Sequence, residues 1–192
     1  QNRVSLDYED MPQVMKDAVV AAENRSFWED PGFSISGMAR GAWSIATGGE
    51  LQGGSTITQQ YIKILYLDSG QRLSRKVREL MLAIKMGREL PKEEILEGYL
   101  NTIYFGRGAY GIQAAARSFF LKDAKDLTLE ESAALAAILN NPAAFNPSGG
   151  PEKLEKLLGR YQYVLDGMLE MGAITQAEHD RAHPALPEFP EV

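Results

Sequence analysis

The sequence predicts a mainly α-helical domain, because apolar residues recur at helical spacing and helix-start and helix-stop residues bracket them. Residues 73–90 are the clearest example, with Leu73, Val77 and Ile84 on one side of an amphipathic helix. Alternation of apolar and polar residues never extends beyond a few positions, and the sequence contains no internal repeat. These observations favour an α fold over one built on a sheet.

The ends of the expected helices are marked along the chain. Some helices begin where a proline favours the first turn, and two begin at a Thr-x-x-Glu capping box. Glycines are placed to stop others, and Gly172 is the clearest case. In order, helices are expected from Pro12, over residues 34–47, after residues 53–55, over 73–90, from Pro91, after Gly111, after Thr128, over 151–171 and from Thr175.

Composition narrows the classes of function. The chain has 192 residues, of which 44% are hydrophobic and 24% charged, as in ordinary globular domains. Its net charge of −6 argues against a nucleic-acid partner, which needs a basic surface. The absence of cysteine excludes thiol catalysis and Cys-ligated zinc. Both histidines, His179 and His183, lie near the C-terminus, which argues against a His-based triad or a His-rich metal site.

The chain is expected to contain one main domain, residues 1–182, followed by a Pro-rich linker at residues 183–192 that leads toward an absent C-terminal domain. No apolar run is long enough to span a bilayer, and no signal peptide is visible. Any membrane anchor is therefore expected outside this sequence.

Glu23 is the first candidate for catalysis. It follows Met15 and Val19 at four-residue spacing, so its carboxylate is expected on or beside the apolar face of the first helix. Burial penalises the charged form of a carboxyl group and makes that group a better proton acceptor. Spacing alone equally fits a Glu at the edge of the core that pairs with Arg25 or another base.

The second candidate is Gly-Gly-Ser-Thr-Ile-Thr-Gln-Gln at residues 53–60. Two glycines allow close backbone approach, and the helix start that follows offers free N–H groups to an anion. Hydroxyl and amide donors suited to phosphate or sugar follow at Ser55, Thr56, Thr58 and Gln59. A helix start that is merely well capped would account for the same residues, and Ser55 alone would supply the cap.

The third candidate is the basic helix at residues 72–88, which carries six positive charges and one negative charge, Glu79. Arg75 and Lys76 precede Glu79 by four and three residues, so the three groups can converge. Such a run is usually a solvated helix face. A glutamate held among bases also suits a diphosphate site, since cations stabilise a leaving group whose negative charge grows.

Two further regions are less specific. The glycine-rich loop at residues 106–111 opens a helix, but it lacks the strand context of a nucleotide-binding loop. Aromatic and apolar residues are dense at residues 27–45, where glycines also occur. That region fits ordinary core packing, or a flexible patch that dips into a membrane surface and admits a lipid chain.

Five segments in order share their residues with the motifs of one family. They are residues 22–27, 53–60, 75–79 continued by 95–101, 108–116 and 141–147. Together they resemble the family 51 glycosyltransferases, the polymerase domain of class A penicillin-binding proteins and of their monofunctional relatives. Three positions depart from the family pattern: Asn24 replaces an Asp, Asp30 stands where many members have His, and Asn140 falls where Lys or Gln is frequent.

The resemblance implies a lysozyme-like helical fold with a small, flexible, membrane-facing lobe. It implies a moenomycin-sensitive enzyme that polymerises lipid II into glycan strands, with inversion and release of undecaprenyl diphosphate. Expected partners are lipid II, the growing glycan, the membrane surface and cell-wall synthesis proteins, with no nucleic acid. The expected location is the extracytoplasmic face of the bacterial plasma membrane, with an N-terminal transmembrane anchor outside this chain.

The resemblance also assigns roles to residues. Glu23 would be the general base toward the acceptor's sugar 4-hydroxyl, and Glu79 would position the diphosphate with the bases around it. A Mg²⁺ or Mn²⁺ ion could assist there, although no ligand set stands out in the sequence, and no organic cofactor is expected. The substrate-binding residues it implies are Arg25, Ser55, Thr56, Gln59, Gln60, Lys63, Arg75, Lys76, Asn101 and Tyr110.

Two other functions fit the same residues. A lysozyme-like enzyme that cleaves glycan would also use a partly buried Glu on a helix, but its neutral leaving group would not need the basic helix. A catalytically silent module that binds cell-wall precursor is the second alternative, and the intact pair of Glu23 and Glu79 counts against it.

Overall fold

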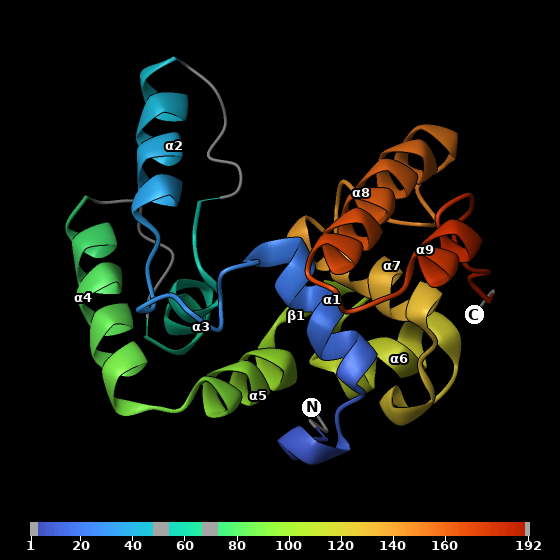
Figure 1. Cartoon of the computed structure of the whole chain (residues 1–192), viewed down its shortest axis with the longest axis horizontal. Coiled ribbons are helices and arrows are strands. Elements are labelled where there is room, and N and C mark those ends of the chain that lie inside the picture. The colour runs from blue at the N-terminus through green and yellow to red at the C-terminus, as the bar shows by residue number, and fades with distance from the viewer. Residues whose placement is uncertain (1–3, 48–53, 67–72, 191–192) are drawn as a thin grey trace. The chain divides into compact units, whose positions relative to one another are not determined.

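A computed structural model of the chain describes residues 4–47, 54–66 and 73–190 (Figure 1). The described part is mainly helical, which confirms the predicted fold class. Its elements are η1 (Tyr8–Asp10), α1 (Gln13–Glu23), α2 (Ile35–Ala46), α3 (Ile57–Tyr66), α4 (Leu73–Glu89), α5 (Lys92–Thr102), β1 (Tyr104–Gly106), β2 (Ala109–Tyr110), α6 (Ile112–Phe120), η2 (Ala124–Asp126), α7 (Leu129–Asn140), α8 (Pro151–Glu170) and α9 (Gln176–Ala182).

The predicted helix boundaries are confirmed where the local chemistry is strongest. Thr128 and Thr175 each cap a helix through a complete capping box, in which the hydroxyl accepts from the backbone N–H of the Glu three residues later. Pro151 is the first residue of α8, and Gly172 follows its end with φ of +71°, a conformation that favours glycine.

The sequence did not predict the small β-hairpin of β1 and β2. The strands pair antiparallel, with Tyr104 opposite Tyr110, and have three and two residues. Arg107 and Gly108 form the turn with φ of +49° and +71°. Strands this short carry no detectable alternation, so sequence pattern could not reveal them.

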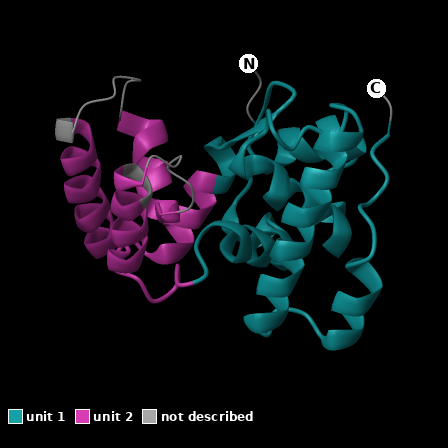
Figure 2. Ribbon diagram, turned by 90° about the horizontal axis from the view of Figure 1, so that it is seen from above, with its two compact units in different colours: residues 1–25, 100–192 teal, residues 26–99 magenta. Residues whose placement is uncertain are grey.

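The chain divides into two compact units, shown in different colours in Figure 2: residues 1–25 with 100–192, and residues 26–99. We call them unit 1 and unit 2. The predicted domain of residues 1–182 contains nearly all of unit 1 and the whole of unit 2.

Unit 1 is organised around α7. Every residue from Ser132 to Leu139 is buried. This helix is therefore enclosed on all sides, as its continuous apolar sequence requires. Helices α1 and α8 pack against α7 and against each other (Figure 1). Met15 and Val19, the apolar face of α1, are fully buried, and this packing fixes the helix that carries Glu23.

Unit 2 contains α2, α3, α4 and most of α5, and α3 packs on α4. Glycines permit its closest backbone contacts. Gly32 has φ of +93°, and a Cβ there would lie 2.5 Å from the carbonyl oxygen of Ala83 on α4. A Cβ on Gly37 would lie 2.4 Å from the carbonyl oxygen of Gly54. The start of α2 is thereby held against the segment that leads into α3.

Residues 183–190, the described part of the predicted Pro-rich linker, pack against helices of unit 1. The ring of Phe189 stacks on Phe120 of α6 with centroids 5.3 Å apart, and Gln162 donates to the carbonyl oxygen of His183. The domain boundary near residue 182 stays a prediction. Across the described residues, no helix combines the length and apolarity that crossing a membrane requires.

Candidate active site

Glu23 occupies the last position of α1, where its side chain is 6% exposed. Two side chains of unit 1 reach its Oε1: Asn140 Nδ2 at 3.3 Å and Arg160 Nη2 at 3.5 Å. The same Arg160 nitrogen donates to the carbonyl oxygen of Ala22 at 2.7 Å. The predicted burial of the carboxylate is confirmed, and a cation and an amide hold it in place.

Arg25 binds elsewhere in unit 1. Its Nε donates to the Ala21 carbonyl, its Nη1 pairs with Glu170 at 2.6 Å, and its guanidinium lies over the Tyr163 ring. One interpretation of the sequence paired Arg25 with Glu23. In the structure Arg160 makes that contact instead. These contacts give Arg25 a structural role, while its substrate-binding role stays a prediction.

The second predicted site lies in unit 2, where α3 packs on α4. The side chain of Glu79 is 4% exposed, and its Oε1 accepts a hydrogen bond from Lys76 Nζ. The same ammonium group donates to Ser55 Oγ at 3.1 Å. Lys76 is itself half exposed, so one accessible cation links the residue 53–60 motif to the buried carboxylate of α4.

Thr56, rather than Ser55, caps α3. Its hydroxyl accepts from the backbone N–H of Gln59 at 3.1 Å, and Gln59 Oε1 accepts from the Thr56 N–H at 2.9 Å. Both residues are buried, and the Thr56 hydroxyl donates to the Gly32 carbonyl. The alternative interpretation of this segment, a helix start that is merely well capped, gave the cap to Ser55. Because Thr56 does this instead, the Ser55 hydroxyl lies beside Lys76.

The remaining predicted residues of unit 2 lie on the same two helices, α3 and α4. Gln60 accepts from the Tyr99 hydroxyl at 2.8 Å and contacts the Ser55 carbonyl. Lys63 is exposed in the last turn of α3, and Arg75 is half-buried on α4. Arg72, which belongs to the predicted basic helix, lies outside the described residues.

Asn101 and Tyr110 belong to unit 1. Asn101 Nδ2 donates to the Leu6 carbonyl at 2.9 Å and its Oδ1 accepts from the Leu6 N–H at 3.0 Å, so this side chain fastens the N-terminal segment. The Tyr110 ring is partly exposed and lies against Tyr104, with centroids 4.8 Å apart. Substrate binding by both residues stays a prediction.

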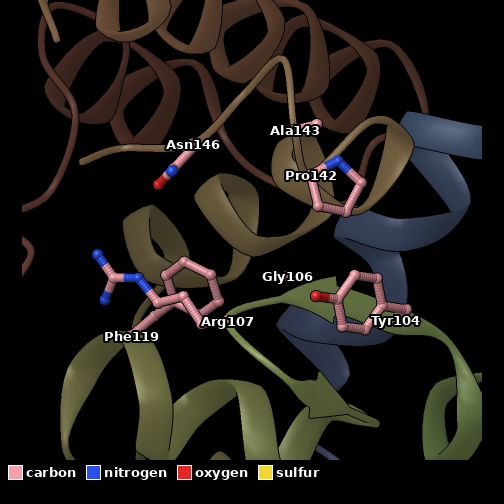
Figure 3. A pocket seen from close by; sticks show the side chains of 7 residues that line it. All are labelled: Tyr104, Gly106, Arg107, Phe119, Pro142, Ala143 and Asn146. Atoms are coloured by element: carbon pink, nitrogen blue, oxygen red, sulfur yellow. The ribbon is translucent and has the colours of Figure 1, made fainter. Parts of the chain in front are cut away.

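A cavity of about 250 Å³ lies in unit 1 beside the fifth motif segment, and residues just before and just after the fourth segment complete its lining. Figure 3 shows the loop after α7, with Pro142 and Asn146, facing the hairpin and α6. Arg107 contributes a guanidinium that stacks on Phe119 and donates to Ser148 Oγ at 2.7 Å. Tyr104 adds an exposed aromatic ring.

The region at residues 27–45 is part core and part surface. Phe27 is fully buried beneath Lys92, whose Nζ lies 4.7 Å from the ring centroid. On α2 the large apolar side chains are exposed instead, Ile35 by 75% and Trp43 by 73%. The side chain of Ile45 lies outside the described residues. The segment therefore contributes to the core through Phe27 and to the surface through α2, and contact of that surface with a membrane stays a prediction.

The sequence comparison decides the family. The sequence model of a family described as transglycosylase matches residues 1–169, most of the chain. The chain belongs to the transglycosylase family, the family 51 glycosyltransferases. The predicted family and the predicted class of enzyme, a peptidoglycan glycosyltransferase, are confirmed.

Relatives of this transglycosylase domain are much longer proteins. Penicillin-binding protein 1A of Mycobacterium tuberculosis is 45% identical over 191 residues, covering 97% of this chain and 23% of the relative. Penicillin-binding protein 1A of Vibrio cholerae is 41% identical over 192 residues, covering 98% and 23%. The chain therefore spans about a quarter of the length of these relatives.

A solved structure supports the fold. The 2.6 Å crystal structure of penicillin-binding protein 1A from Haemophilus influenzae aligns with a TM-score of 0.59 and 24% identity. The alignment covers 100% of this chain and 19% of that one. At this identity the likeness is evidence for a shared fold.

The departures from the pattern of the transglycosylase family have defined places. Asn140 donates to Glu23, so its amide supplies a neutral hydrogen bond where Lys or Gln is frequent. The side chain of Asp30 is 6% exposed, pairs with Lys92 at 3.1 Å and accepts from the Gly32 N–H. Both substitutions leave Glu23 and Glu79 intact.

Sequence reasoning missed Arg160 as a neighbour of Glu23. Its signal was slight, because Arg160 lies 137 residues further along the chain on α8. The sequence also gave no sign that the two histidines lie beside a carboxylate. Among the described residues, the His and acidic side chains close enough to share an ion are Asp166, His179 and His183.

Proposed function

We propose that this transglycosylase domain polymerises lipid II. The 4-hydroxyl of the acceptor sugar attacks the anomeric carbon of the donor chain, with inversion, and undecaprenyl diphosphate leaves. The family match and the two buried glutamates support this reaction.

Glu23 is the proposed general base. Its burial and its fixed position on α1 suit a group that must meet one hydroxyl in one orientation. Arg160 and Asn140 both contact the Oε1 atom, which restricts rotation of the carboxylate. In this proposal Arg160 is a positioning residue that acts through Glu23.

The cluster of unit 2 is the proposed diphosphate site. Lys76 is exposed enough to reach a ligand while its contacts with Ser55 and Glu79 hold the ammonium in place. Arg75 on α4 and Lys63 on α3 add positive charge on the two helices that form the cluster. Cations fixed in advance stabilise the charge that develops on a departing diphosphate without reorganising during the step.

One observation carries the proposal. Two segments predicted separately, residues 53–60 and the basic helix, are joined in the folded chain by the single ammonium group of Lys76. A solvated helix face would not place a buried carboxylate beneath that cation. This arrangement suits a diphosphate site, because Glu79 fixes Lys76 while the half-exposed ammonium group stays accessible to a ligand.

The residues around Glu79 do not fit a protein-held Mg²⁺ or Mn²⁺ site. Such ions take about six oxygen ligands, and the Oε1 atom of Glu79 already accepts from Lys76. Charge neutralisation is therefore assigned to the protein's own cations. A Mg²⁺ or Mn²⁺ ion that assists would bind through the oxygens of the diphosphate.

We propose the exposed apolar side chains of α2 as the membrane contact, and the extracytoplasmic face of the plasma membrane as the location. Trp43 and Ile35 are largely exposed, and Met38 is 42% exposed on the same helix. Large exposed apolar groups are typical of a surface that enters the headgroup region of a bilayer. The cavity beside Tyr104 and Arg107 is a proposed contact for the growing glycan, and cell-wall synthesis proteins remain proposed partners.

The test is polymerisation of labelled lipid II in detergent, with products separated on a gel. The native chain is expected to give a ladder that muramidase digests, while Glu23→Gln and Glu79→Gln give none. Glu155→Gln on α8 and Glu89→Gln on α4 are matched controls, since both remove the same charge at exposed positions. Far-UV circular dichroism shows that each variant is folded.

The outcomes separate the alternatives. Cleavage of preformed glycan without a ladder would identify a lytic enzyme. Unchanged lipid II with every folded protein would identify a silent binding module. A normal ladder from Glu23→Gln would remove the base assigned here while retaining the polymerase.

A further inference from the structure

Three side chains of unit 1 converge where α9 packs on α8. His179 Nε2 lies 2.7 Å from Asp166 Oδ1, and His183 Nε2 lies 3.3 Å from the same oxygen. The three ligand atoms all lie within 4.8 Å of one another, and the two imidazole rings are 4.7 Å apart. The position of the histidines in the sequence argued against a metal site. The fold supplies the carboxylate, from another helix.

Neighbouring groups fix the ring of His179. His179 Nδ1 lies 3.2 Å from Asp180 Oδ1, which turns its Nε2 toward Asp166. Gln176 in turn donates to Asp180 at 2.7 Å. A carboxylate on the far nitrogen of a ligating histidine is the usual outer partner in protein metal sites, because it fixes the tautomer and the ring orientation.

We propose that Asp166, His179 and His183 form a zinc-binding site that clips α9 to α8. Two imidazoles and one carboxylate are a ligand set that Zn²⁺ accepts, with solvent completing the tetrahedron. Ligands about 2.0–2.1 Å from a tetrahedral ion lie about 3.4 Å from each other. The Asp166–His183 distance already matches, and the Asp166–His179 distance needs to open by less than 1 Å.

Both histidines of the chain lie in this cluster. The sequence has two histidines and no cysteine, so both of its imidazoles belong to the cluster. Asp166 is 54% exposed and His183 34%, which leaves an entry path for the ion. His179 is 13% exposed and sits deepest, beside Asp180. Magnesium is not expected here, because it prefers oxygen ligands.

The site would strengthen the end of unit 1. Helix α9 has seven residues, too few to be stable without packing. His183 immediately follows α9 and precedes the segment in which Phe189 stacks on Phe120. A metal bound by groups on both helices would hold this exit of the chain in one place.

The experiment is a titration of the metal-free chain with Zn²⁺. Calorimetry measures the binding, and the ¹⁵N resonances of the histidine rings report which groups bind the ion. Because there are only two histidines, the ring signals report the site without any variant. We expect one Zn²⁺ per chain, perturbation of both rings, a raised Tm and tetrahedral-type absorption with Co²⁺. Mg²⁺ should leave the rings unchanged.

Variants test the ligand set. His179→Gln and Asp166→Asn are expected to abolish stoichiometric binding, while Asp180→Asn should weaken it about tenfold, as outer-shell changes do. Glu155→Gln on α8 is the matched control and should bind as the native chain does. The proposal would be overturned if Zn²⁺ left the histidine ring resonances of the native protein unchanged. It would also be overturned if Asp166→Asn bound Zn²⁺ as the native chain does, or if Mg²⁺ perturbed the rings as much as Zn²⁺.

Discussion

Replacing Arg160 with Met tests whether this arginine holds the carboxylate of Glu23. The substitution keeps an apolar side chain of similar length and removes every donor. Glu23 Oε1 then loses a contact at 3.5 Å, and the Ala22 carbonyl loses a bond of 2.7 Å. Both acceptors lie where the side chain of Glu23 is 6% exposed, so water replaces the guanidinium poorly.

The magnitude follows from these contacts. A hydrogen bond to a charged group contributes about 1.5–3 kcal/mol to stability. Two features of the structure lower the expected loss. The contact to Glu23 is long, and the Nε atom of Arg160 is buried without a hydrogen-bond partner, so its removal relieves a cost of about 1–3 kcal/mol. We therefore expect Arg160→Met to lower the free energy of unfolding by about 1.5 kcal/mol.

A double-mutant cycle isolates the pair. Urea unfolding of the native chain, Arg160→Met, Glu23→Gln and the double variant gives the coupling energy, expected at about 1 kcal/mol. The control cycle uses Arg25 and Glu170, whose side chains are 32% and 68% exposed, and whose coupling should fall between 0 and about 1 kcal/mol.

The same variants separate positioning from packing. If Arg160 acts through Glu23, Arg160→Met lowers kcat for lipid II polymerisation with little change in KM, and Arg160→Lys restores part of it. Zero coupling between Arg160 and Glu23, together with native kcat in the folded Met variant, would refute the reasoning.

Three further changes have expected outcomes. Gly159→Ala on α8 meets no atom within 4 Å and should raise the free energy of unfolding by about 0.5–1 kcal/mol in urea, whereas Gly32→Ala, at φ of +93° and 2.5 Å from the Ala83 carbonyl oxygen, should lower Tm. Thr56→Ala removes the cap of α3 and should cost about 1 kcal/mol, with weaker amide-exchange protection confined to unit 2; uniform loss across both units would contradict this. Hydrogen bonds from Arg117 and Gln113 hold the pKa of Asp123 below its ordinary value of 3.8, so the stability it contributes is complete above pH 3.8 and is lost as the pH falls through its lower, folded-state pKa. The difference in Tm between the native chain and Asp123→Asn should therefore shrink on acidification below pH 3.8, and a difference that grew there would contradict the assignment.

Local patterns predicted much of the fold and part of the site. The spacing of Met15, Val19 and Glu23 predicted a carboxylate at the edge of the core, and the structure buries it. The three-residue spacing of Lys76 and Glu79 predicted their pairing. Each of these relations lies within one helix, where spacing along the sequence fixes spacing in space.

Relations between helices could not be predicted in this way. Asn140 and Arg160 reach Glu23 from 117 and 137 residues away, and only the packing of α1, α7 and α8 brings them there. Arg25, two residues from Glu23, was the nearer candidate along the chain. It turns to Glu170 instead, because the helix ends at Glu23 and the backbone changes direction at Asn24.

The end of α1 explains why an arginine is needed at this point. Glu23 is the last residue of the helix, where unpaired carbonyl groups concentrate partial negative charge. The carboxylate of Glu23 therefore lies beside partial charge of its own sign, unlike a carboxylate at a helix start. One nitrogen of Arg160 contacts both negative groups, since Nη2 donates to the Ala22 carbonyl and also contacts the Glu23 carboxylate. A neutral donor such as Asn140 can satisfy an oxygen but cannot offset this charge. The catalytic proposal for Glu23 therefore depends on α8 as much as on α1, the helix that carries it.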